Sequence, residues 1–270
     1  MKTPRIADRA GAARAIGTVA LAGLTLLTGC ATDSTLLGSG TTTLASDKAR
    51  LTHSGFLSDY ARLQPTPWGH GIECWRDPSL DARNYDKILV ARILVSLKVK
   101  NAEQTFDPKD IKTLTDYFHQ DLVKALKPQM PVVEQAGPGV VVLRVALTDL
   151  VPTTVTDSLA GTLIPYAFIA EAGSGAATGR PAGSTPYMGE TGMEMQFRDG
   201  ASGKVIAECR DTEIGRKYAV DVNESAAGAA QTWANGYLSS FQAWSYAKDA
   251  FDKWSMLVAQ RIAQLRGVQP

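Results

Sequence analysis

The alternation of apolar and polar residues predicts a β-sheet from four parts of the chain. In 85–99 and in 140–150 apolar side chains recur at every second position, which is typical of strands with one buried face. Within 192–209 two alternating runs flank the turn sequence Asp-Gly-Ala-Ser-Gly, so this part is a predicted β-hairpin. A short stretch at 131–134 can pair with 140–150 as a second hairpin.

Two other parts carry the spacing of amphipathic helices. Asp107 and Pro108 form a helix start, apolar residues then recur three and four apart, and Pro128 ends the run. A longer helix is predicted at 239–266, where the apolar positions are Trp244, Ala247, Phe251, Trp254, Val258, Ile262 and Leu265. The order strand, helix, strands, hairpin, helix favours an α+β fold: a two-layer sandwich in which helices cover one face of a mainly antiparallel sheet.

The remaining long stretches lack this periodicity. Residues 156–188 form an insertion with an apolar first half and a Gly-rich second half, which we expect to be a surface loop or helical hairpin. Its glycines at 175, 179 and 183 are spaced as in a glycine zipper, so membrane contact or self-association is the alternative. Residues 30–50 are rich in Ser, Thr and Gly and are a predicted flexible tether before a single domain at 51–270.

The N-terminus has the arrangement of a secretion signal. Basic residues at positions 2, 5, 9 and 14 precede an apolar stretch at 15–28, which is too short to be an ordinary membrane-spanning helix. The stretch closes with Leu27-Thr28-Gly29-Cys30, which resembles the lipobox of bacterial lipoproteins. The resemblance implies removal of a signal peptide at 1–29 and attachment of diacylglycerol and a further acyl chain, such as palmitate, to Cys30. Ala31 after the cysteine favours the periplasmic face of the outer membrane over retention in the inner membrane.

The net charge and the short motifs of the sequence limit the classes of function that the protein can have. The whole chain has a net charge of +1, but removal of the leader takes away four basic residues and Asp8 and leaves −2. The sequence therefore predicts no nucleic-acid partner, and no second apolar run reaches membrane-spanning length. Ser245 and Lys248 match a Ser-x-x-Lys pattern without its usual partner motifs, and no histidine pair has metal-ligand spacing. We predict no catalytic, cofactor-binding or metal-binding residue, and a protein that is not an enzyme.

Two cysteines remain once Cys30 carries lipid. In an oxidising compartment Cys74 and Cys209 are candidates for one disulfide. The alternative is a buried free thiol, because Cys209 falls on the apolar face of its predicted strand.

Three further segments carry a family resemblance. They are Ser-Gly-Phe-Leu-Ser-Asp-Tyr-Ala-Arg-Leu at 54–63, Tyr-Asp-Lys-Ile-Leu-Val at 85–90, and the hairpin at Asp199 and Gly200. With the lipobox, they resemble the bacterial lipoproteins grouped as domain of unknown function 3313, and the Gly-Phe-Leu-x-x-Tyr pattern is the most specific element. The resemblance implies an envelope lipoprotein and supplies no activity and no active-site residues.

These observations predict a protein that acts by binding. We expect a non-catalytic component of envelope assembly or an accessory to transport, held to membrane lipid by Cys30, with an envelope protein or a second copy of itself as partner. The alternative is a carrier that shelters an apolar ligand or lipid between helix and sheet, in a cavity lined by Trp244 and Trp254.

Overall fold

The computed structural model describes residues 43–45, 51–68, 71–97, 106–152, 189–215 and 243–267, with backbone alone for 43–45. The predicted signal peptide at 1–29, the lipid attachment site Cys30 and the insertion at 156–188 lie outside the described residues.

The described strands form one mixed sheet of eight strands. They are β1 (Thr43–Ala45), β2 (Gln64–Pro65), β3 (Glu73–Arg76), β4 (Lys87–Val90), β5 (Leu94–Val95), β6 (Val140–Val151), β7 (Glu190–Asp199) and β8 (Val205–Gly215). The order is β2-β3-β8-β7-β6-β4, with β1 also on β8 and β5 also on β6. The strands β4 and β5 run parallel to β6, and the other pairs are antiparallel. Three residues of the range predicted as tether thus form β1.

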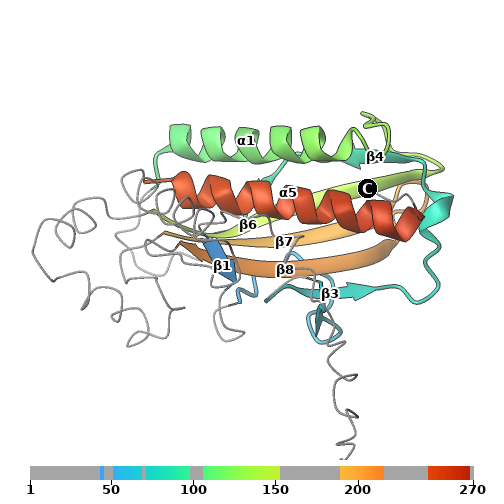
Figure 1. Ribbon diagram of the computed structural model, residues 1–270, viewed down its shortest axis with the longest axis horizontal. Helices are drawn as coiled ribbons and strands as arrows, with labels where there is room; N and C mark the ends of the chain where they lie inside the picture. The colour runs from blue at the N-terminus through green and yellow to red at the C-terminus, as the bar shows by residue number, and fades with distance from the viewer. Residues whose placement is uncertain are drawn as a thin grey trace, which may run out of the picture. The chain divides into compact units, whose positions relative to one another are not determined.

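Two long helices, α1 (Pro108–Leu126) and α5 (Ser245–Arg266), pack together over one face of this sheet (Figure 1). The side chain of Asp107 accepts a hydrogen bond from the backbone N–H of Lys109, which caps α1 as the sequence predicts. Gly267 has a φ of 72°, a left-handed conformation that favours glycine, and it ends α5. Between helices and sheet, Phe118 stacks on Phe251 with ring centroids 4.4 Å apart. The predicted α+β fold agrees with these elements.

Two predicted strands are arranged differently from the prediction. The stretch 85–99 does not form one strand, because one extra residue interrupts it: Val90 pairs with Leu143, whereas Leu94 pairs with Ala146. The stretch 131–134 does not form a hairpin with β6. Val132 instead bridges Ile88 of β4, since both edges of β6 are already occupied, by β4 and β5 on one side and by β7 on the other.

Candidate functional site

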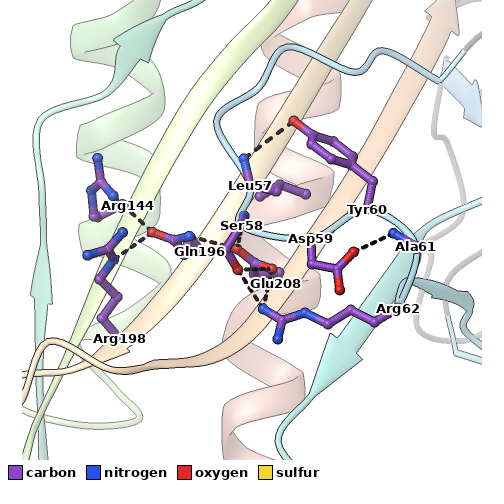
Figure 2. Close-up of polar contacts among 10 residues, drawn as sticks. All are labelled: Leu57, Ser58, Asp59, Tyr60, Ala61, Arg62, Arg144, Gln196, Arg198 and Glu208. Carbon is purple, nitrogen blue, oxygen red and sulfur yellow. Dashed lines mark hydrogen bonds and ion pairs between the residues drawn. The ribbon is translucent and has the colours of Figure 1, made fainter.

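The Gly-Phe-Leu-x-x-Tyr pattern lies across the sheet face that the helices leave uncovered. We call residues 52–62 the motif segment. Figure 2 shows it in front of the strands that carry Gln196 and Glu208, with α5 behind them. Because side chains alternate along a strand, Glu194 of β7 and Glu208 of β8 point to this face, while Met195 and Cys209 point toward the helices.

Glu208 is fully buried beneath the motif segment. Its carboxylate accepts hydrogen bonds from the backbone N–H of Ser58 at 2.7 Å, from the hydroxyl of Ser58 at 2.9 Å and from Nη2 of Arg62 at 2.7 Å. Nε2 of Gln196 donates a further bond at 2.6 Å (Figure 2). Burial raises the pKa of Glu208, but the donors, led by Arg62, outweigh burial and hold the pKa below its ordinary value.

Two arginines complete this network from neighbouring strands. Oε1 of Gln196 accepts hydrogen bonds from Nη1 of Arg144 at 2.9 Å and from Nε of Arg198 at 2.6 Å (Figure 2). Burial and the adjacent charge of Arg198 lower the pKa of Arg144. The two cationic donors fix the orientation of the amide, so that its nitrogen faces Glu208.

Glu194 receives the first half of the motif segment. The backbone N–H of Ser54 donates to its carboxylate at 3.0 Å and the Ser54 hydroxyl at 2.5 Å, and the phenol of Tyr60 donates at 2.8 Å. The Tyr60 oxygen in turn accepts from the N–H of Gly55 at 2.8 Å. Burial and the bond to Glu194 raise the pKa of Tyr60. Gly55 has a φ of 89°, so glycine is favoured where the segment turns.

The motif segment therefore has a structural explanation. Its serine, tyrosine and arginine donors supply hydrogen bonds to two buried carboxylates of the sheet, and its own Leu57 is only 5% exposed. Sequence reasoning did not assign Glu194 or Glu208 to a site. The available signal was the pairing of a Ser- and Tyr-containing segment with acidic positions on the polar face of a hairpin.

A second acidic cluster lies on β8, on the side of the sheet that faces the helices. Nζ of Lys253 lies 2.6 Å from Oε1 of Glu213, and Nε1 of Trp254 donates to Asp211 at 2.8 Å. Burial and the neighbouring charge of Glu213 raise the pKa of Asp211 well above its ordinary value, against the opposing effect of Lys253. Sequence reasoning missed this cluster, although Asp211 and Glu213 occupy positions in line with Cys209, where an apolar residue is the norm.

The cysteines predicted as a pair are joined in the structure. Cys74 of β3 and Cys209 of β8 lie directly opposite each other and form a disulfide with a Cα–Cα distance of 4.1 Å. The bridge links the short β3 to the long hairpin.

An apolar groove of about 290 Å³ lies between the C-terminal half of α5 and the strands β2 and β3. Its floor consists of Met130, Val141 and Ile206, which belong to the hydrophobic core. Its walls include Trp68, Trp75, Phe197, Val258, Ile262 and Leu265. A cavity lined by Trp244 and Trp254 was the wrong location, because Trp254 is 1% exposed within the core and Nε1 of Trp244 donates to Asp110. The groove lies farther along α5.

Other candidate chemistry is limited within the part of the chain that the structure describes. Here no three His, Cys, Asp or Glu side chains gather as a metal ligand set. Neither described helix is long and apolar enough to cross a membrane. Ser245 and Lys248 lie in the first turn of α5, where the Lys248 ammonium is 5.4 Å from the ring centre of Tyr117.

This chain carries an α+β domain after a sequence that resembles the lipobox of bacterial lipoproteins. It belongs to the family described as protein of unknown function DUF3313, which matches residues 52–237 and so includes the motif segment. It is 31% identical over 133 residues to the uncharacterized lipoprotein YdcL of Escherichia coli strain K12, and equally to the protein of that name in E. coli O157:H7. The match covers 48% of this chain and 54% of YdcL, so the chain spans about half the length of the curated relatives it matches.

Solved structures give distant resemblances. The PelC dodecamer from Paraburkholderia phytofirmans matches with a TM-score of 0.29 and 13% identity, over 64% of this chain and 98% of PelC. A DUF330 protein from Xanthomonas campestris matches with a TM-score of 0.28 and 11% identity, over 70% of this chain and 94% of that protein.

Proposed function

We propose that this lipoprotein is anchored through acylated Cys30 to the periplasmic face of the outer membrane and acts by binding an apolar ligand in the apolar groove. The observation that carries the proposal is the groove itself, at about 290 Å³ close to the lower end of the range of roughly 300–1,000 Å³ for small-molecule sites. Its lining of Trp, Phe, Val, Ile and Leu side chains favours a hydrocarbon over a polar substrate.

The absence of catalysis is part of the proposal. Glu194 and Glu208 are held by donors from their own chain, and Asp211 is buried against Trp254, so these carboxylates have structural partners that account for them. This supports a binding role.

Assembly through a protein contact is a second candidate function. It is favoured by β5, where Leu94 and Val95 are 43% and 40% exposed, an unusual place for two large apolar side chains. Strands at the margin of a sheet also offer backbone groups to a partner strand.

Photocrosslinking in intact cells tests both candidates. A photoreactive residue in place of Val258 is expected to capture a lipid-sized adduct, detected by mass spectrometry of the purified protein, whereas one in place of Lys124, exposed on α1, serves as a control. Capture of a protein from Leu94 and nothing from Val258 would favour assembly over ligand binding. Replacement of Cys30 by Ser should abolish lipid labelling and membrane fractionation, and unchanged labelling would contradict the anchor.

A further inference from the structure

Three arginines line the apolar groove. One of them, Arg266, donates to the backbone carbonyl of Gln129, and the other two are Arg76 and Arg261. Arg76 follows the disulfide on β3 and Arg261 lies on α5 beside Val258 and Ile262. Burial lowers the pKa of Arg261, and the nearby positive charge of Arg76 lowers it further. Both guanidinium groups border the same largely hydrocarbon surface.

Among the described residues, neither guanidinium forms an ion pair with a carboxylate. Nη1 of Arg261 donates to the neutral Gln264 at 3.1 Å, and its guanidinium lies 5.5 Å from the ring centre of Trp68. By contrast, Arg62 pairs with Glu208 and Arg210 with Glu73. Arg144 and Arg198 resemble Arg261 in donating to a neutral amide, but they do not line the groove. Two like charges on the lining of one apolar groove, Arg76 exposed and Arg261 half-buried, favour an anion between them.

We infer that the apolar groove binds a single-chain amphiphile with an anionic headgroup, its hydrocarbon against Phe197, Val258 and Ile262 and its acid group between Arg76 and Arg261. The inference rests on the proposed function and specifies its ligand class. The headgroup can be a carboxylate, as in a fatty acid, or a phosphate, as in a single-chain phospholipid. Guanidinium binds both by charge-assisted hydrogen bonds.

The test uses the acylated full-length protein in phosphatidylcholine nanodiscs, with empty nanodiscs as the reference. Decanoate, decyl phosphate, decanol and decylammonium are titrated separately, and the fluorescence of Trp68 and Trp75 in the groove reports binding. Decanoate or decyl phosphate should bind about tenfold more tightly than decanol, and decylammonium most weakly. Which of the two acids binds better separates the carboxylate from the phosphate source. Inorganic phosphate alone should not bind, because it lacks the hydrocarbon chain that supplies the hydrophobic contribution to affinity.

Variants of the protein test separately the contacts made by the headgroup and those made by the hydrocarbon of the probe. Arg76→Gln and Arg261→Gln should each weaken binding of the acidic probes about fivefold and leave decanol unchanged. Arg92→Gln, on the exposed loop before β5, is the matched control and should change nothing. Val258→Phe should block all four probes by filling the groove. Ile262→Phe provides the same block if circular dichroism shows that Val258→Phe is misfolded.

The outcomes distinguish this inference from the proposed function. If decanol binds as tightly as the acids and the arginine variants have no effect, the inference is wrong and apolar binding stands. If none of the four probes binds to the wild-type protein, and Val258→Phe gives the same result, both the inference and the proposed function are wrong. If Val258→Phe alters sedimentation of the protein without affecting decanoate, the groove is an interface between copies and the inference is overturned.

Discussion

Glu208 and Asp211 lie three residues apart on β8 and face opposite sides of the sheet, yet burial has opposite results for the two carboxyl groups. On the motif face, the pKa of Glu208 is lowered because Arg62, Gln196 and Ser58 all donate to its carboxylate. On the helix face, the pKa of Asp211 is raised well above its ordinary value because it is surrounded by core and lies beside Glu213.

The number of hydrogen-bond donors around a buried carboxyl group, more than its depth in the protein, decides whether its pKa falls or rises. A loop can bring several N–H and O–H groups to one carboxylate, since its backbone is not committed to a ladder. The helices offer side chains alone. Asp211 accepts from Nε1 of Trp254 and from the backbone N–H of Thr212, and Lys253 is one cation beside two acids, Asp211 and Glu213. The motif face thus holds an acid with a lowered pKa and the helix face an acid with a raised pKa.

The largest expected effect comes from the covalent link between the hairpin and β3. The double substitution Cys74→Ala and Cys209→Ala should lower the free energy of unfolding by about 4–5 kcal/mol, because the bridge closes a loop with a sequence separation of 135. Urea unfolding of oxidised wild type, reduced wild type and the double variant measures the effect. Equal midpoints for all three would show that the motif segment holds β3 in place without the bridge.

Removal of the Glu208 carboxylate should cause the next largest loss in the free energy of unfolding. Glu208→Ala should destabilise the protein by about 3 kcal/mol, at the lower end of the range for a broken buried ion pair because Arg62 is 26% exposed. Asp59→Asn, an exposed change in the same segment, is the matched control and should lie within about 0.5 kcal/mol of wild type. If thermal denaturation shifts equally in both, the network does not stabilise the fold.

A single hydroxyl tests the other half of the motif segment. Tyr60→Phe removes the bond to Glu194 and the acceptor for the N–H of Gly55, with an expected cost of about 1–2 kcal/mol. The ring remains, so its tilted contact with the ring of His53 is retained. Native-state hydrogen exchange at Gly55 should accelerate while exchange in α1 is unchanged, and unaltered exchange at Gly55 would contradict the role given to the phenol.

The smallest effect at neutral pH is expected on the helix face. Asp211→Asn keeps one side-chain oxygen as acceptor for Trp254 and removes the charge, but its amide nitrogen replaces the oxygen that accepts from the N–H of Thr212. Stability should therefore fall by no more than about 1 kcal/mol. In wild type, an acid with a raised folded pKa makes stability fall as pH rises from its ordinary value of 3.8 toward the folded value. The variant should lose this fall, and an unchanged stability profile above pH 3.8 would contradict a protonated Asp211.

Glu208 should contribute the opposite slope. Its pKa is lowered on folding, so its stabilisation is present above the ordinary value of 4.5 and is lost as pH falls toward the folded value. Glu208→Gln should therefore flatten the acid limb of the stability curve measured by urea unfolding. A steeper acid limb would mean that the carboxylate is not held ionised by its donors.

The sequence by itself determined the elements whose signals are local. The capped helix after Asp107, the hairpin around Gly200 and the long C-terminal helix were predicted from spacing and turn residues, and the structure contains all three. The lipobox at Cys30 and the family resemblance were also readable from residues alone, and the DUF3313 match confirms the family.

Only the tertiary structure decided how distant parts meet. The partner of 131–134 depended on which strand edge was free, and the place of the apolar groove depended on where α5 diverges from β3. The contact of the motif segment with Glu194 and Glu208 joins residues more than 130 positions apart, and no local periodicity predicts it. Burial, charge state and cavity shape are properties of neighbours in space, so they followed from packing and not from pattern.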